Sequence, residues 1–215
     1  MTDEAIADLL PSLARLFAGW ALACLAGVAL GLAMGRCATL AALVEPLLHF
    51  CRSVPPSSLL PVFLLLFEIG TPMQLAAIAY GVIWPVLINT MDAGRHVDRR
   101  CLEIGVVFKL SAGTRLLRIL LPAAAPKIFA GLRLSVSLAL IMMVVSELYG
   151  SSEGIGHRML EAQSRIDIPA MWAGTMLVGA LGMLLNAGFL AAEHRLLRRH
   201  PSRHRPHPLV SRTGA

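Results

Sequence analysis

Long stretches without charged residues recur along the chain and predict helices that cross a membrane. Three such stretches cover 16–35, 69–91 and 168–192. An α-helix rises about 1.5 Å per residue, so each of them is long enough to cross a hydrocarbon core about 30 Å thick. A fourth span, 128–147, contains Arg133 near its start, where a long side chain can reach the membrane surface.

The fifth apolar stretch, 53–68, is short for a span and contains three prolines, Pro55, Pro56 and Pro61. The last of them removes a helix hydrogen bond. We interpret the stretch as a span with a broken start, whose freed backbone groups are shielded by neighbouring helices; a re-entrant segment is the alternative. The preceding stretch, 37–51, contains a glutamate and a proline, and we expect it to be an interfacial helix leading into this span.

Composition supports a membrane protein. Residues of the set AVILMFWYC make up 56% of the 215 residues and charged residues only 15%, whereas soluble domains have about 45–50% and about 25%. This balance excludes intrinsic disorder and argues against an ordinary soluble enzyme. The net charge of +6 fits basic cytoplasmic loops, so we expect no nucleic-acid partner. The four cysteines form no C-x-x-C pair, and we expect no metal or other cofactor.

The distribution of basic residues predicts the orientation. Five spans place the two termini on opposite sides of the membrane. Most Lys and Arg residues, with Arg36 and Arg52 among them, fall in one set of connections, whereas the opposite side has only Arg15, Arg158 and Arg165. Basic residues collect in cytoplasmic loops, so we expect the N-terminus outside and the C-terminus inside. The predicted layout is an outer segment 1–14, a transmembrane domain 15–193 with an inner loop 93–127, and a basic inner tail 194–215.

The first span has small residues at every fourth position, namely Gly19, Ala23, Gly27, Gly31 and Gly35. This spacing places them along one ridge of a helix. Such a ridge lets another helix approach closely, and we expect it to pack against a helix of the same chain or of a second copy.

Two carboxylates are expected at the outer ends of spans, Glu68 and Glu147. Ionisable groups inside a membrane are costly and often functional, which makes both candidates for the transport pathway. The alternative is that both side chains reach the headgroup region and are only solvated there.

The longest connection, 93–127, has the pattern of two short helices. The apolar residues of 96–110 have helical spacing, 111–113 is a breaker, and 114–120 reads as a second helix that begins at Thr114 and stops before Pro122. Two short helices joined by a tight turn form a protrusion that a soluble partner can bind. A helix lying on the bilayer surface is the alternative.

The same connection resembles the EAA motif of ABC importer permeases. Glu103-Ile104-Gly105 is followed 16 positions after Glu103 by Ile119-Leu120-Leu121-Pro122, which is the spacing of that motif. Other segments resemble the sulfonate, taurine and nitrate branch of these permeases: Arg52-Ser53-Val54-Pro55-Pro56, Leu60-Pro61, Trp84-Pro85, Asn89-Thr90, Glu147, and Gly154-Ile155-Gly156. The likeness covers nearly the whole chain, and the order and spacing of the motifs carry it.

The chain departs from the family pattern at several places. The glycine of the motif falls on Lys109, so either Gly113 takes over the turn or the geometry of the loop differs. The two alanines of the motif are Ile104 and Gly105. Glu68 stands where relatives usually have glycine, and many relatives carry an additional N-terminal span.

The resemblance implies an all-α membrane protein of the type I importer fold, in the inner membrane of a bacterium. It implies three protein partners, which are a separate ATPase, a second permease subunit and an external solute-binding protein that docks near 151–169. The chain itself has no phosphate-binding loop for ATP and is not expected to be an enzyme. The implied substrates are sulfonates, taurine, nitrate or a thiamine precursor.

The resemblance also implies roles for individual residues. The ATPase-coupling candidates are Glu103, Ile104, Gly105, Lys109, Ser111, Gly113, Ile119, Leu121, Pro122 and Gly131. The pathway candidates are Glu68, Trp84, Asn89 and Glu147. A secondary transporter or channel is the alternative function, but we see no inverted repeats that would favour it. A membrane enzyme would need a convergent set of His, Asp, Glu or Cys residues, and the histidines are scattered or lie in the tail.

Overall fold

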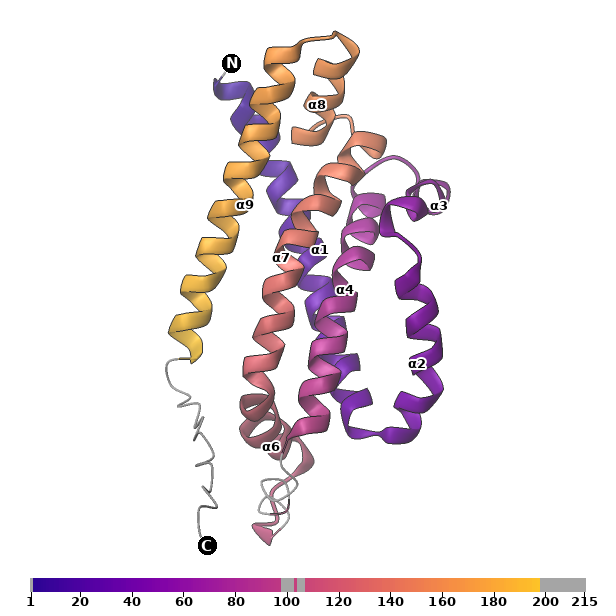
Figure 1. Cartoon of the computed structure of the whole chain (residues 1–215), viewed down its shortest axis with the longest axis vertical. Coiled ribbons are helices and arrows are strands. Elements are labelled where there is room, and N and C mark those ends of the chain that lie inside the picture. Colours follow the sequence, from indigo (N-terminus) through magenta and orange to yellow (C-terminus); the bar gives the residue numbers. More distant parts are fainter. Residues whose placement is uncertain (1, 98–102, 104–106, 198–215) are drawn as a thin grey trace, which may run out of the picture.

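The chain folds into a bundle of long helices, as shown by a computed structural model that describes residues 2–97, 103 and 107–197 (Figure 1). No strand occurs among these residues. The elements in chain order are α1 (Thr2–Arg36), α2 (Ala38–Ser53), the short 3₁₀ helix η1 (Pro56–Leu59), α3 (Leu60–Phe67), α4 (Thr71–His96), α6 (Ala112–Arg115), the π-helical turn η2 (Leu116–Leu120), α7 (Leu121–Gly150), α8 (Ile155–Ser164) and α9 (Ile168–Leu197).

Four helical segments are long and apolar enough to cross a membrane, namely Asp8–Arg36, Thr71–His96, Ala112–Gly150 and Ile168–Leu197. The helices Ala38–Ser53 and Pro56–Phe67 together make a fifth candidate, bent by 85°. The all-α membrane fold with about five spans is therefore confirmed. We call the two ends of the bundle the α8 end and the α6 end (Figure 1).

The centre of the bundle is α4, which packs against α1 on one side and α7 on the other. The small residues of α1 face α4. A Cβ atom built on Gly31 would lie 2.7 Å from the Leu87 carbonyl oxygen, and one on Gly35 would lie 2.6 Å from that of Met91. Ala23 is buried in the same core. The ridge of α1 therefore packs within the chain.

The last helix, α9, lies at the periphery and has no buried residue within Ile168–Leu197. It contacts α7 where Gly182 meets Leu140, and the Phe189 ring lies 6.2 Å from that of Phe129. This leaves most of α9 exposed, as expected for a helix that faces lipid or another subunit.

The region 37–68 is divided differently from our expectation. The long piece that runs beside α4 along the bundle is α2, whereas the segment predicted as the span, 53–68, turns away from it after Ser53 (Figure 1). Pro55 and Pro56 explain the break, because the residue before a proline leaves the helical region and a proline supplies no N–H. The glutamate of α2, Glu45, is tolerated because it pairs with Arg95 of α4 at 3.4 Å.

This division also changes the place of Arg52, which the sequence assigned to an inner connection. The Tyr80 hydroxyl donates a hydrogen bond of 2.6 Å to the carbonyl oxygen of Cys51, the residue before Arg52. Tyr80 lies in the first half of α4, nearer the α8 end than the α6 end. Arg52 is therefore beside the body of the bundle, away from its α6 end.

Candidate functional site

The α6 end carries the described part of the predicted coupling loop. Glu103 is helical and exposed, and Ser111 caps α6 by accepting a hydrogen bond of 3.3 Å from the Thr114 N–H. The predicted helix start at Thr114 was wrong, because Ser111 is the N-cap and α6 begins at Ala112, two residues earlier. Ile104 and Gly105 lie outside the described residues.

The turn before α6 is made at Lys109. Its φ angle is 51°, in the left-handed region, whereas Gly113 lies inside α6 with no positive φ angle. The idea that Gly113 takes over the turn was wrong, because the chain keeps the turn at the motif position. A side chain in this region costs about 1–2 kcal/mol, which this chain tolerates at a lysine.

The helix after this turn continues into the membrane. Residues Ala112–Gly150 form one helical path of 39 residues, with Ile119 inside the π-helical turn η2 and Leu121 and Pro122 at the start of α7. The predicted stop before Pro122 was wrong, because the helical path continues through it. The π-helical turn η2 directly before Pro122 changes the backbone hydrogen-bond pattern at the place where the proline supplies no N–H. A force on α6 would thus act directly on α7.

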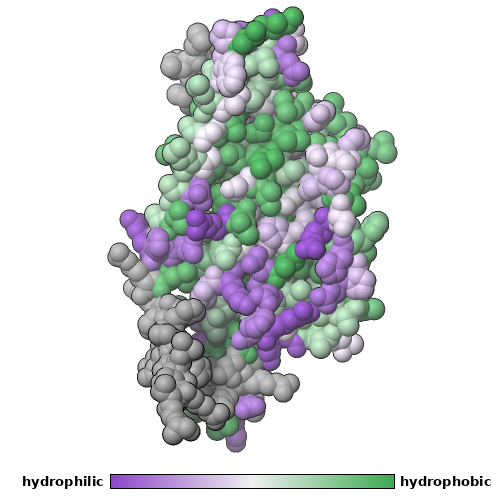
Figure 2. Space-filling model, viewed as in Figure 1, coloured by the Kyte–Doolittle hydropathy of each residue, from purple (hydrophilic) through white to green (hydrophobic). Residues whose placement is uncertain are grey.

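Ion pairs and a close helix contact tie the base of this loop together. Lys127 of α7 binds Asp92 of α4 at 2.6 Å, and the His96 Nδ1 atom lies 3.0 Å from the Asp92 carboxylate. Further along α7, a Cβ atom on Gly131 would lie 2.9 Å from the Pro85 carbonyl oxygen, so α7 and α4 touch there. Figure 2 shows hydrophilic residues gathered toward this end, below a more hydrophobic middle.

Two pathway candidates lie on α4. The Asn89 side chain donates to the Pro85 carbonyl oxygen at 2.8 Å and so serves its own helix. The Trp84 ring stands edge-on to Tyr80 with centroids 5.2 Å apart, and its buried Nε1–H has no hydrogen-bond partner in the described part of the chain. Of these two side chains, that of Trp84 has a hydrogen-bond donor without a partner among the described residues.

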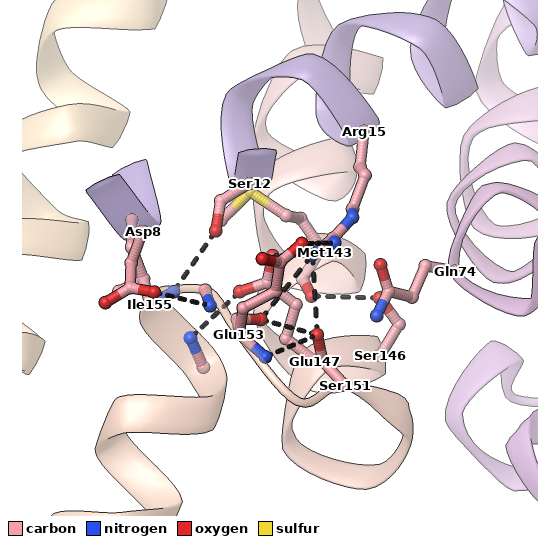
Figure 3. Close-up of polar contacts among 12 residues, drawn as sticks. Asp8, Ser12, Arg15, Gln74, Met143, Ser146, Glu147, Ser151, Glu153 and Ile155 are labelled. Atoms are coloured by element: carbon pink, nitrogen blue, oxygen red, sulfur yellow. Dashed lines mark hydrogen bonds and ion pairs between the residues drawn. The ribbon is translucent and has the colours of Figure 1, made fainter. Parts of the chain in front are cut away.

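The other two pathway candidates have opposite surroundings. Glu68 is exposed in the turn between α3 and α4, with a φ angle of 61°. Glu147 is only 1% exposed, and its Oε2 atom accepts a hydrogen bond of 2.9 Å from the Gly156 N–H. The structure does not place Glu147 among solvated headgroup-facing residues, because its carboxylate points into the protein (Figure 3).

A polar cluster surrounds Glu147 at the α8 end (Figure 3). Three successive N–H groups at the start of α8, those of its N-cap Gly154 and of its first two residues, are bound by side chains. Gly154 is bound by Asp8 at 3.1 Å, Ile155 by Ser12 at 3.1 Å, and Gly156 by Glu147. The Arg15 Nη1 atom lies 3.6 Å from the Glu147 Oε1 atom, and Arg15 also pairs with Glu153. Arg158 of α8 pairs with Asp8.

The cluster fastens α8 to the start of α1. Asp8, Ser12 and Arg15 are spaced by four and three residues and so share one face of α1. A buried carboxylate is costly unless it is paired and hydrogen-bonded, and here the Gly156 N–H supplies the hydrogen bond and the Arg15 guanidinium the pairing. Sequence analysis missed the three α1 residues, although polar residues at helical spacing ahead of an apolar helix were a usable signal.

Comparison with known proteins now identifies the family. The family model of the binding-protein-dependent transport system inner membrane component matches residues 25–199. The chain belongs to this family. The recognition made from the EAA-like motif is therefore confirmed.

Relatives of known name point to one branch of the family. The chain is 31% identical to the nitrate import permease protein NrtB of Leptolyngbya laminosa, over 89% of this chain and 70% of that protein. It is 30% identical to the putative aliphatic sulfonates transport permease protein SsuC of Bacillus subtilis, over 92% and 72%. It is also 30% identical to the bicarbonate transport system permease protein CmpB of Synechococcus elongatus, over 81% and 63%.

Solved structures show the same fold. A chain of the MetNI methionine ABC transporter, in an inward-facing conformation, superposes with a TM-score of 0.75 at 16% identity, over 90% of this chain and 94% of that chain. An amino acid ABC transporter gives a TM-score of 0.65 at 16% identity, over 92% and 94%. The chain is thus a membrane permease subunit of the ABC importer type, from the nitrate, sulfonate and bicarbonate group, and its family consists of transporter subunits rather than enzymes.

Proposed function

We propose that this chain is driven by a separate ATPase that binds its α6 end, and that it forms a transport pathway together with a second permease subunit. The observation that carries this proposal is the uninterrupted helix Ala112–Gly150, which begins beside the motif residues and continues into the core of the bundle. ATP-driven closure of the ATPases would displace α6, and α7 would move with it as one body.

The contacts at the base of the loop spread this motion. The Lys127–Asp92 pair and the contact at Gly131 join α7 to α4, so α7 cannot shift without acting on α4. Because α1 packs closely on α4 through its glycines, the three central helices would rock together. Glu103 is exposed at this end, where it is accessible to a soluble partner.

The α8 end is the proposed docking surface for a solute-binding protein, with this end outside the cell. A cleft of about 780 Å³ lies there between α8, α9 and the start of α1. Its walls carry both charge signs, with Arg158 and Arg165 beside Asp8, Glu161 and Asp167. Complementary charged patches favour encounter and specificity between proteins. The cluster around Glu147 keeps this surface in a fixed position relative to α1.

The proposed substrate is a small oxyanion. Nitrate, aliphatic sulfonates and bicarbonate, for which the relatives are named, all expose delocalised negative oxygen atoms. A thiamine precursor, also implied by the sequence resemblance, carries no oxyanion group and is the competing substrate.

The test is reconstitution. The purified permease with its cognate ATPase and binding protein is placed in proteoliposomes, and uptake of nitrate, taurine and bicarbonate is measured with and without ATP. We expect the ATPase to co-purify and at least one of these three solutes, each of which carries an anionic oxygen group, to enter only when ATP is supplied. Uptake that does not depend on ATP, or an isolated permease that transports by itself, would contradict the proposal and favour a secondary transporter or channel.

A further inference from the structure

One face of α2 is polar although the helix runs beside the membrane-crossing bundle. Glu45, His49 and Arg52 are spaced by four and three residues and so share this face. The opposite face has apolar side chains that are strongly exposed, namely Leu43 at 79%, Leu47 at 60% and Phe50 at 69%. The apolar face suits lipid, whereas charged side chains within a membrane face a water-filled cavity or the interior of a bundle.

The polar face adjoins the side of α2 that packs on the protein. That side consists of Ala41, Val44 and Leu48, which pack with Met34, Leu87 and Met91. Glu45, at the α6 end of the polar face, is already neutralised by Arg95. Arg52, at the other end, contacts the His49 Nδ1 atom at 3.4 Å and forms no ion pair with another described residue.

Arg52 lies well within the depth of the bundle. Its neighbour Cys51 is bonded to Tyr80, which is nine residues from Thr71 and sixteen from His96 along α4. At about 1.5 Å per residue this is about 14 Å from one end of α4 and about 24 Å from the other. A guanidinium at this level is far from the surface at the α6 end.

The chain also breaks at this level. Helix α2 ends at Ser53, and the following helices turn by 85°. Exposed serines line the break, with the Ser53 hydroxyl bonded to the His49 carbonyl oxygen at 2.7 Å. One turn beyond Tyr80, the Trp84 Nε1–H is buried without a described partner. Broken helices near the middle of the membrane are where transporters commonly bind their substrates.

We propose that Arg52 is the cationic group that contacts the transported oxyanion, at the corner between α2 and η1. This inference rests on the proposed function. The planar guanidinium offers two parallel N–H donors that can bind two oxygen atoms of nitrate, bicarbonate or a sulfonate group at once. The ammonium group of a lysine lacks this paired geometry. His49 is a positioning residue that holds the guanidinium from one turn away.

The first experiment measures uptake by the complete importer in proteoliposomes, with nitrate, taurine and bicarbonate as probes. We expect Arg52→Gln to raise the KM for the transported anion roughly 10- to 100-fold, since a hydrogen bond to a charged group contributes that much. Arg52→Lys should recover part of the loss. Arg36, at the end of α1, gives the matched control, and Arg36→Gln should leave the KM unchanged.

The second experiment uses a permease whose native cysteines are replaced and that carries Arg52→Cys. A positively charged methanethiosulfonate reagent should react with this thiol and restore uptake, whereas a negatively charged reagent should react without restoring it. Leu43→Cys on the apolar face of the same helix should not react. These results require a water-accessible corner and a positive charge at it.

Each of three outcomes would overturn either the proposed function or the role of Arg52. If the wild-type importer takes up none of the three anions, the proposed function fails at the substrate. If it takes up an anion and Arg52→Gln has the same KM, the role of Arg52 is overturned while the function stands. If Arg52→Cys inserts and binds the ATPase but does not react with charged reagents, Arg52 faces lipid or a headgroup phosphate, and the inference is overturned as well.

Discussion

Three non-glycine residues in the described part of the chain, Glu68, Lys109 and Ile166, have φ angles of 61°, 51° and 58°. At two of them, Glu68 and Lys109, the resemblance of the sequence to ABC importer permeases implies a glycine, and glycine adopts a positive φ angle readily. Each such residue stores about 1–2 kcal/mol of strain, a cost that the sequence alone showed only as a missing glycine.

This strain predicts that Glu68→Gly stabilises the protein. Glycine relieves the strain of the positive φ angle, and this gain should exceed the cost of the larger conformational entropy that glycine gives the unfolded chain. We expect the free energy of unfolding to rise by about 0.5–1 kcal/mol. Unfolding by denaturant in detergent micelles measures it. Glu161→Gly, inside α8, is the control and should destabilise by about 1 kcal/mol. Loss of stability in Glu68→Gly would contradict the backbone conformation.

The buried carboxylate of Glu147 gives a second prediction. Glu147→Ala removes the acceptor for the Gly156 N–H and leaves Arg15 without this partner. We expect the free energy of unfolding to fall by about 3 kcal/mol. Glu147→Gln keeps an acceptor oxygen and should lose less. Protease cleavage of the α7–α8 loop in membranes should follow the same order. An Ala variant as resistant as wild type would show that the cluster does not hold the loop.

At the scale of elements, the closest helix contact is the one between α1 and α4. A side chain at Gly31 would collide with the backbone of α4, whereas one at Gly179 of α9 would meet nothing within 4 Å. We therefore expect Gly31→Ala to lower stability by about 1–3 kcal/mol. Gly179→Ala, the control, should be neutral or stabilising. Thermal unfolding in micelles compares the two, and equal effects would argue against the α1–α4 packing.

The sequence predicted the long helices well and the connections poorly. Apolar stretches with few or no charged residues located α1, α4, α7 and α9, because in a membrane such a stretch of about 20 residues leaves few alternatives. The prolines near residue 55 predicted a break in the helix. They did not show that the segment before the break, α2, is the one that runs along the bundle. The hydrogen-bond acceptors of the Gly154 and Ile155 N–H groups could not be predicted from the sequence, since Asp8 and Ser12 are more than 140 residues away along the chain.

At the scale of the whole molecule, we propose that the α6 end lies inside the cell and the α8 end outside. With this orientation, Cys101, outside the described residues, would belong to the inner loop and Ser152 to the outer α7–α8 loop. In intact cells that produce single-cysteine variants of the protein, a maleimide that cannot cross the membrane should label Ser152→Cys and leave Cys101 unlabelled. Labelling of Cys101 from outside would invert the topology and remove the ATPase from the coupling loop.

We propose that ATP hydrolysis on another subunit drives transport through the loop 93–127, which contains Glu103. The most direct measurement is the amount of anion taken up per ATP hydrolysed by the reconstituted importer, for the wild type and for Glu103→Lys. We predict that the variant inserts normally but takes up at least tenfold less anion per ATP hydrolysed, because reversing this exposed charge weakens ATPase docking. Uptake per ATP equal to that of the wild type would contradict the account.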